Sequence, residues 1–386
     1  MVAIAEIPKG YRKTDVGVIP KEWEVDSISQ LASITTGSKN TQDKIDDGDF
    51  PFFVRSQTVE RINSYSFDGE AVLTAGDGVG TGKVFHYIKG KFDFHQRVYK
   101  ISDFKKKLDG YFFYLYFSNH FLNRIMQMTA KSSVDSVRME MIADMKIPHP
   151  PTNAEQKSIA TVLSDIDKLI ANLDEILLKK RNVKQGAMQE LLTGKKRLPG
   201  FSGEWEVKTI KETTDCIDNL RVPLNDNQRS KMQGDIPYCG ANGVLDYVND
   251  YVVDDDIILI AEDGGYFDEY EYRPIAYRMI GKCWVNNHAH ILKAKTNFNQ
   301  GFIFYSLVHK NILRFLASGT RAKLNKSEMY KIEIDVPSEK SEQSAIAQVL
   351  SDMDVEIEDL EQKLNKYRMI KQGMMQELLT GKTRLI

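Results

Sequence analysis

Cysteine is scarce in this chain of 386 residues, and its three cysteines, Cys216, Cys239 and Cys283, all lie in the second half. No two of them have Cys-x-x-Cys spacing, which excludes a zinc ribbon and argues against a disulfide framework. Thiols this few and scattered are typical of proteins in a reducing compartment. We therefore expect a cytoplasmic protein.

Long apolar runs and an excess of charge of either sign are also missing. No segment approaches the roughly 18 consecutive apolar residues of a membrane helix, and the first ten residues lack the apolar core of a secretory signal. The 52 Lys and Arg residues nearly balance 54 Asp and Glu, so the net charge is −2. Bulk positive charge is therefore not a means of binding nucleic acid here, although local basic faces are compatible with this balance.

Recognisable catalytic chemistry is absent as well. The glycine-rich residues 78–83 lack the first glycine of a phosphate-binding loop, and Val84 stands where that loop needs Ser or Thr after the lysine. His288 and His290 alternate on an expected strand and point to opposite faces, which does not favour a metal pair. Paired carboxylates with a lysine at nuclease-like spacing do not recur at equivalent positions of the two modules, and the Asn-Pro-Pro-aromatic signature of an amino-methyltransferase is not present. The sequence predicts no catalytic residue, no metal and no cofactor bound by this chain.

What the chain does contain is a long internal repeat. Residues 155–198 align with residues 342–385 without a gap, and 27 of the 44 positions are identical. Weaker matches upstream, such as the Glu-Trp-Glu-Val at Trp23 and at Trp205, extend the repeat over the whole chain. A period this long indicates one large module used twice rather than a solenoid.

The repeated segment has the pattern of a long amphipathic helix. Apolar residues step by four and three positions in both copies, which is typical of a coiled-coil seam, and two such seams favour mutual antiparallel pairing over packing on each helix's own domain. At 1.5 Å per residue, about 38 residues give a spacer of roughly 57 Å. The expected seam residues are Ile159, Leu163, Ile166, Ile170, Leu173 and Leu177, with Ile346, Leu350, Met353, Ile357, Leu360 and Leu364 in the second copy.

The segments between the repeated helices have the pattern of mixed α/β heads. Buried strands are expected at residues 71–73 and 257–260, half-buried strands at 98–101 and 290–293, and aromatic-rich helices at 110–128 and 301–317. The predicted order is a first head (residues 1–150), a spacer helix (151–196), a second head (197–338) and a second spacer helix (339–386). Because residues 17–23 supply the continuation missing after Lys382, we expect the two chain ends to lie together.

Polar and basic side chains recur in loops of both heads, where they suit phosphate oxygens and base edges. A solvated loop and a structural histidine at a strand end are the alternatives. The candidate DNA-binding residues are Lys83, His95, Gln96, Arg97, Lys131, Ser132, Ser133 and Arg138 in the first head, and Asn287, His288, His290, Thr320, Arg321, Lys323, Asn325 and Lys326 in the second. His95–Arg97 is placed opposite His288–His290.

With this order of modules, the chain resembles the specificity subunits of type I restriction–modification enzymes over essentially its whole length. The resemblance rests on the duplicated helix with its Gln-x-x-Ile-Ala at Gln156 and Gln343, the closing Gln-Glu-Leu-Leu-Thr-Gly-Lys runs, the Gly-Val-Ile-Pro-x-x-Trp start that ends at Trp23, and residues 285–290. It implies an α+β fold with two target recognition domains separated by two long antiparallel coiled-coil helices, related by a pseudo-two-fold and circularly arranged.

The resemblance also implies a function. Each head would read one half of a bipartite asymmetric sequence in double-stranded DNA, and the helices would set the gap and dock two modification (methyltransferase) subunits, with restriction or motor subunits as further partners. S-adenosylmethionine, ATP and Mg²⁺ would then be bound by the partner subunits. The alternatives are a nuclease or methyltransferase with unfamiliar motifs, and a coiled-coil scaffold that does not bind DNA.

Overall fold

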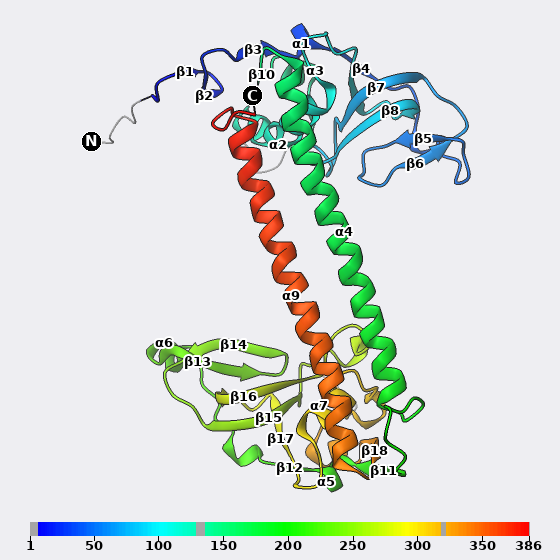
Figure 1. Ribbon diagram of the computed structural model, residues 1–386, viewed down its shortest axis with the longest axis vertical. Helices are drawn as coiled ribbons and strands as arrows, with labels where there is room; N and C mark the ends of the chain where they lie inside the picture. Colours follow the sequence, from blue (N-terminus) through cyan, green and yellow to red (C-terminus); the bar gives the residue numbers. More distant parts are fainter. Residues whose placement is uncertain (1–6, 129–135, 318–321, 386) are drawn as a thin grey trace. The chain divides into compact units, whose positions relative to one another are not determined.

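The computed structural model describes residues 7–128, 136–317 and 322–385, and the chain divides into two compact units. Unit 1 comprises Met1–Leu173 and Lys363–Ile386, and unit 2 comprises Asp174–Gln362. The division falls within the two long helices, α4 (Asn153–Leu191) and α9 (Lys340–Leu378), each of 39 residues (Figure 1). Each unit therefore combines one head with part of both helices.

Unit 1 is built on a six-stranded sheet in which all neighbours are antiparallel except β5 and β8. In sheet order the strands are β4 (Ser33–Thr36), β9 (Val98–Ser102), β7 (Phe67–Ala75), β8 (Phe85–Phe94), β5 (Phe50–Phe53) and β6 (Glu60–Ile62). The other strands form a hairpin of β1 (Tyr11–Thr14) with β2 (Gly17–Pro20) and a pair of β3 (Glu24–Ser27) with β10 (Lys146–His149); the helical segments of the head are α1 (Ile28–Leu31), η1 (Thr41–Asp43), α2 (Gly110–Met128) and α3 (Met139–Ala143).

Unit 2 repeats this sheet with the corresponding strands in the same order. In sheet order they are β12 (Thr214–Cys216), β17 (Ala289–Ala294), β15 (Val253–Ala261), β16 (Ala276–Val285), β13 (Gln233–Gly240) and β14 (Gly243–Val248). A pair of β11 (Trp205–Thr209) with β18 (Glu333–Pro337) completes the strands; the helical segments are α5 (Ile210–Thr213), η2 (Asp218–Leu220), α6 (Asp226–Lys231), η3 (Phe267–Glu269), α7 (Gln300–Val308), η4 (Leu313–Phe315) and α8 (Lys326–Met329). The predicted mixed α/β fold with two-fold repetition is confirmed.

Each sheet is covered on both faces because its central strand is apolar on both. In β7, Val72 faces the core that contains α2 and the start of α4, whereas Ala71 and Leu73 face a second core behind the sheet. Successive side chains of a strand point to opposite faces, so a strand with a core on each side reads as a continuous apolar run. The same division occurs in β15, where Ile258 and Ile260 face one core and Ile257 and Leu259 the other.

One predicted helix is shorter than expected. The pattern predicts a helix through residue 317, but α7 ends at Val308. The Val308 carbonyl accepts a hydrogen bond from the Ile275 N–H at 3.0 Å. The Asn311 side chain accepts from the Leu313 N–H at 3.2 Å and starts a separate turn, η4. Tertiary hydrogen bonds therefore override the apolar periodicity after Val308.

The predicted seam residues serve both the heads and the helix pair. Ile159 and Leu163 belong to the main core of unit 1, and Ile346 and Leu350 to that of unit 2. Packing of each helix start on its own head, the alternative to a pure coiled coil, is thus part of the structure. Of the other predicted seam residues, the buried ones are Ile166, Leu173, Leu177 and Leu364, and the half-buried ones are Ile170, Met353, Ile357 and Leu360.

Ion pairs between the helices show that they run antiparallel. In unit 2, Lys184 of α4 pairs with Asp354 of α9, and Arg181 pairs with Glu361 at 2.5 Å. Residue numbers therefore rise along one helix as they fall along the other. In unit 1, Lys371 pairs with Asp167 at 2.5 Å in the same sense.

Described segments near the two ends of the chain meet in unit 1, in line with the repeat. The Tyr11 hydroxyl donates to the carbonyls of Gly381 at 3.1 Å and Lys382 at 3.0 Å. Gly381 has φ +70°, and a Cβ there would lie 2.6 Å from Pro20 and 3.0 Å from Trp23. In unit 2, Gly194 has φ +67° and lies against Trp205 in the same way. The glycines that end both helices are therefore required by their positive φ and by the tryptophan packed on them.

Candidate functional site

Three loops of unit 1 meet at the end of β7, and backbone hydrogen bonds join them. The Gly76 N–H donates to the Arg97 carbonyl at 2.8 Å, and the Val137 N–H donates to the Gly76 carbonyl at 2.7 Å. Asp77 forms an isolated antiparallel bridge with Ser136. We call this meeting of Gly76, residues 95–97 and residues 136–138 the unit 1 junction. It brings together two of the regions that the sequence singles out separately.

Unit 2 has the same junction, made by the same hydrogen bonds. The Glu262 N–H donates to the His288 carbonyl at 2.8 Å, and the Leu324 N–H donates to the Glu262 carbonyl at 2.7 Å. Asp263 bridges Lys323 as Asp77 bridges Ser136. The unit 2 junction consists of Glu262, residues 286–288 and residues 323–325.

The register of the sheets fixes which residues correspond, and it corrects the sequence alignment. Tyr99 lies opposite Thr74, and His290 lies opposite Ile260, at equivalent places in the two sheets. His95–Arg97 therefore corresponds to Asn286–His288, not to His288–His290 as predicted. The side chain of the first residue accepts the N–H of the third in both turns, at 2.9 Å for His95 and 2.8 Å for Asn286.

The candidate residues of the first head divide by exposure. Lys83, Gln96, Arg97 and Arg138 are exposed, and Gln96 also donates to the Asn40 side chain at 2.6 Å. The prediction that His95 contacts DNA is corrected, because the residue is buried and its ring shapes the turn instead of facing outward. Burial, followed by the nearby Arg55 charge, lowers the pKa of His95, so it is neutral at physiological pH. Lys131, Ser132 and Ser133 lie outside the described residues.

The second head shows the same division. Asn287, Lys323, Asn325 and Lys326 are exposed, and His288 is half-buried with its Nδ1 2.7 Å from Asp263. The prediction that His290 contacts DNA is also corrected, since its side chain is 2% exposed and lies inside the unit. The alternative of a hydrogen-bonded structural histidine therefore holds for His290. Thr320 and Arg321 lie outside the described residues.

Each junction also contains a carboxylate held by arginine, which the sequence analysis missed. In unit 1, Asp77 lies 2.8 Å from Arg55 and 3.7 Å from Arg97. In unit 2, Glu262 pairs with Arg221 and, at 2.9 Å, with Lys323. Burial opposes ionisation of Glu262, but its hydrogen bonds with Lys323 and Arg221 outweigh burial and lower its pKa. In the sequence, Asp77 is marked by an Asp-Gly pattern that recurs at Asp263, but Glu262, the carboxylate that pairs with arginine in unit 2, is not part of that pattern.

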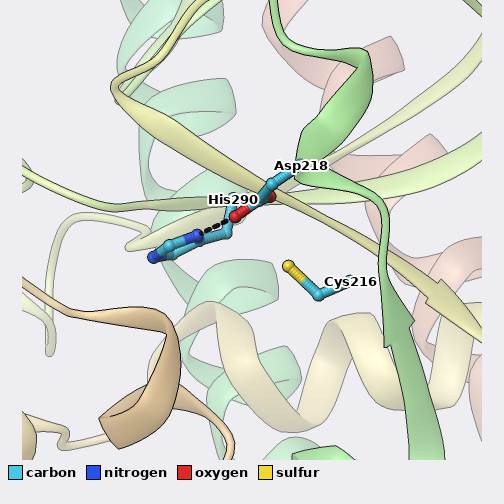
Figure 2. Close-up of side chains that lie close together, drawn as sticks. All are labelled: Cys216, Asp218 and His290. Carbon is cyan, nitrogen blue, oxygen red and sulfur yellow. Dashed lines mark hydrogen bonds and ion pairs between the residues drawn. The ribbon is translucent and has the colours of Figure 1, made fainter.

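Beneath the unit 2 junction, Cys216, Asp218 and His290 lie close together (Figure 2). One potential ligand atom of each lies within 4.8 Å of the others. However, His290 Nδ1 is only 2.6 Å from Asp218 Oδ2, whereas two ligands at 2.0 Å on a tetrahedral zinc are about 3.3 Å apart. This geometry is that of a direct hydrogen bond in an ion pair. Although burial acts against both charges, the pair raises the pKa of His290 to about 9 and lowers that of Asp218 to about 2.

A second group, Glu24, Asp26 and His149 in unit 1, has an ammonium where a cation would lie. Lys107 Nζ is 2.5 Å from Asp26 and 3.0 Å from Glu24, and His149 Nε2 is 3.2 Å from Asp26. These hydrogen bonds join the pair of β3 with β10 to the loop before α2. Among the described residues, this group and the one at His290 are those that could hold a metal ion by proximity, and both are arranged as ion pairs.

Comparison with known proteins shows the family. The model of the type I restriction modification DNA specificity domain matches residues 20–179 and again residues 202–367. The chain belongs to this family and carries the domain twice. It is a DNA specificity subunit of the type I restriction–modification class, with no catalysis of its own. Among the described helices, none is long and apolar enough to cross a membrane.

Individual relatives are similar at moderate identity. The chain is 25% identical over 430 residues to the MjaX specificity subunit of Methanocaldococcus jannaschii, covering 98% of this chain and 97% of that protein. It is 37% identical over 142 residues to a type I restriction enzyme specificity subunit of Haemophilus influenzae, which covers 37% of this chain and 35% of that one. The chain is also 25% identical over 240 residues to the EcoDI specificity subunit of Escherichia coli, and this match covers 54% of this chain and 52% of that protein.

Solved structures share the fold. The type I restriction–modification S subunit of M. genitalium superposes with a TM-score of 0.67 at 16% identity, covering 92% of this chain and 96% of that one. A chain from a structure of complex assembly and conformational transition in a type I system gives a TM-score of 0.53 at 11% identity. This match covers 95% of this chain and 99% of that one. At these identities the similarity establishes the fold alone.

Proposed function

We propose that the two junctions read the two halves of a bipartite, asymmetric DNA sequence, one half per unit. The observation that carries this proposal is that the two junctions have the same backbone hydrogen bonds but carry different side chains at corresponding positions. At corresponding positions, unit 1 exposes Gln96, Arg97 and Arg138, where unit 2 has Asn287, His288 and Asn325. Two readers with one frame and different side chains suit a target whose halves differ.

The side chains at these positions have the chemistry of base recognition. In the major groove, Arg pairs with guanine through two hydrogen bonds, and Gln or Asn pairs with adenine. Contacts with phosphates position a protein on DNA without specifying sequence, which suits exposed lysines such as Lys83 and Lys326. The pairing of Arg97 with Asp77 and of His288 with Asp263 restricts the rotamers of the reading side chains. Restricted side chains lose less entropy on binding, which favours affinity, and their fixed geometry matches one base edge better than another.

The same proposal assigns the partners and cofactors. The exposed faces of α4 and α9 dock two modification subunits, which carry S-adenosylmethionine, and restriction or motor subunits supply ATP hydrolysis with Mg²⁺ in the cytoplasm. The net charge of −2 supports a division of labour in which partners contribute much of the DNA affinity. The isolated chain then binds DNA weakly and with strong salt dependence.

Exchange of one head tests the proposal. Residues 37–148 would be replaced by the corresponding segment of a relative with a known target, in the full complex with modification subunits. Methylation mapped on genomic DNA should show one altered half-site and one unchanged half-site. A complex in which both halves change, or in which neither changes, would contradict one reader per unit.

A further inference from the structure

In unit 1, a tyrosine of the sheet holds the loop that carries Arg138. The Tyr99 hydroxyl, at the start of β9, donates to the Val137 carbonyl at 3.0 Å. The N–H of Val137 is already bound to the Gly76 carbonyl at 2.7 Å. Val137 is buried, and Arg138, the next residue, is exposed. Both peptide groups of Val137 are therefore fixed directly before an exposed arginine.

In unit 2, a histidine makes the corresponding link. His290 Nε2 donates to the Leu324 carbonyl at 2.8 Å, and the Leu324 N–H is bound to the Glu262 carbonyl at 2.7 Å. Leu324 is buried and Asn325, which follows it, is exposed. The sheet register makes His290 equivalent to Tyr99, and the hydrogen bonds of the junctions make Leu324 equivalent to Val137.

The ring nitrogen of His290 that faces away from the Leu324 carbonyl is bound by Asp218, whose carboxylate has further hydrogen-bond partners. Asp218 Oδ2 lies 2.6 Å from His290 Nδ1 (Figure 2). The other oxygen, Asp218 Oδ1, accepts the Ile291 N–H at 2.9 Å. Arg221 lies 3.3 Å from the same carboxylate. Both ring nitrogens of His290 therefore have partners, and the ring has a single orientation toward the loop. Continuing the register of β12 with β17 two residues past Cys216 places Asp218 opposite His290, and in unit 1 Thr36 of β4 lies opposite Tyr99, so we take Thr36 as the position equivalent to Asp218.

We propose that Tyr99 and His290 are positioning residues for base recognition, each holding the carbonyl that orients the next residue, Arg138 or Asn325, toward DNA. This inference rests on the proposed function. The residues differ in chemistry while the hydrogen bond is kept, which indicates that the link itself is what each unit needs. A reading side chain must be held within about 0.5 Å of its productive position, and a fixed peptide group directly before it provides that restraint.

The test in unit 1 compares two tyrosines within the assembled complex. Tyr99→Phe removes the hydroxyl that reaches Val137 and keeps the ring. Tyr87→Phe is the matched control, because its hydroxyl donates to Glu70 at 2.5 Å in the same unit but away from the junction. Methyl-transfer rates are measured on duplexes carrying the mapped target or single-base changes in either half. Tyr99→Phe should lower discrimination about fivefold in the half read by unit 1 only, as expected for one lost hydrogen bond.

The test in unit 2 exchanges the link for its unit 1 counterpart. His290→Phe with Asp218→Thr removes the link without leaving a buried charge unpaired, and should relax only the other half-site about fivefold. His290→Tyr with Asp218→Thr recreates the Tyr99 and Thr36 pair, and should restore discrimination to within about twofold. A general loss of folding would reduce activity in both double variants alike, whereas the proposal requires the tyrosine to rescue.

The outcomes separate this inference from the function on which it rests. Relaxation of both halves by Tyr99→Phe, equal relaxation by Tyr87→Phe, or no rescue by His290→Tyr would overturn the positioning role. Hydrogen exchange of the complex without DNA gives an independent measurement. Loss of either link should speed amide exchange at least severalfold at Val137 or Leu324, whose N–H groups are hydrogen-bonded within the junctions. Faster exchange in the variants, together with a wild-type complex that shows no bipartite preference, would contradict the proposed function and leave the link in place.

Discussion

Arg384 and Glu155 form a bidentate ion pair in unit 1 that Arg197 and Glu342 repeat in unit 2. The distances are 2.5 and 2.8 Å in the first pair and 2.6 and 2.7 Å in the second. Both glutamates are buried at the starts of the long helices, and both arginines come from the segment that follows the partner helix. Each pair thus joins the beginning of one helix to the end of the other.

Removal of Arg384 should destabilise unit 1 selectively. Arg384→Met leaves the Glu155 carboxylate buried without its partner, which typically costs about 3 kcal/mol, because an unpaired buried charge loses its solvation. Urea unfolding followed by hydrogen exchange would report each unit separately. Lys382→Met, at an exposed neighbouring residue, is the control. If Arg384→Met weakened unit 2 as much as unit 1, the ion pair would not be the cause.

Stability of unit 2 should fall between pH 6.5 and pH 9. The pKa of His290 is raised from 6.5 to about 9, so its contribution is complete below pH 6.5 and is lost as pH rises through 9. The pKa of Asp218 is lowered from 3.8 to about 2, so its contribution is complete above pH 3.8 and is lost as pH falls through 2. The maximum lies between pH 4 and 6.5, and the alkaline loss is about 3 kcal/mol for the coupled pair.

Urea titrations at pH 6.5 and pH 9 check this prediction. The double variant His290→Tyr with Asp218→Thr should lose the pH dependence. A Cys216→Ser background removes the neighbouring thiol from the titration, and Glu262, 3.7 Å from His290, stays ionised throughout this range. An unchanged slope in the double variant would assign the pH dependence to another group.

Lengthening both helices by one heptad should lengthen the gap in the DNA target. Seven residues inserted after Leu173 and seven after Gln362, where the two units divide, add about 10.5 Å at 1.5 Å per residue. At about 3.4 Å per base pair, the preferred gap should grow by about three base pairs, with both half-sites unchanged. Insertion in α4 alone is the control, since it shifts the seam against α9. A preferred gap that stayed the same in the doubly lengthened complex would argue against a spacer role.

Arg97 should contribute sequence discrimination, whereas Lys83 should contribute charge. Arg97→Ala is expected to relax one position of the unit 1 half-site by about 1 to 3 kcal/mol. Lys83→Ala should leave specificity intact and reduce the slope of log K against log salt by about 0.9. Binding of the complex to mapped and singly substituted duplexes at several salt concentrations measures both effects. A specificity change in the Lys83 variant with an unaltered salt slope would reverse these roles.

The repeated helices were predictable because identity and periodicity agree there, and Leu177 and Leu364 are buried as the seam requires. The junctions were only partly predictable. Loops of different length separate the strands in the two heads. Matching histidine with histidine therefore aligned His95 with His288, two residues away from its structural counterpart, Asn286. The partner of His290 is Asp218, 72 residues earlier, and strand alternation alone does not show which face is closed by a loop. Long-range pairing of this kind is fixed by tertiary structure and leaves no local pattern.

The division of the chain has a consequence for its synthesis. Unit 2 is one continuous stretch, Asp174–Gln362, whereas unit 1 needs Met1–Leu173 together with Lys363–Ile386. Leu378 and Leu379 share a core with Phe112 and Ile159, which a ribosome makes more than two hundred residues earlier. Domains fold as they emerge, so unit 2 can close its core while unit 1 still exposes an unfinished apolar face. The half of the protein that is translated first is therefore the half that completes its folding last.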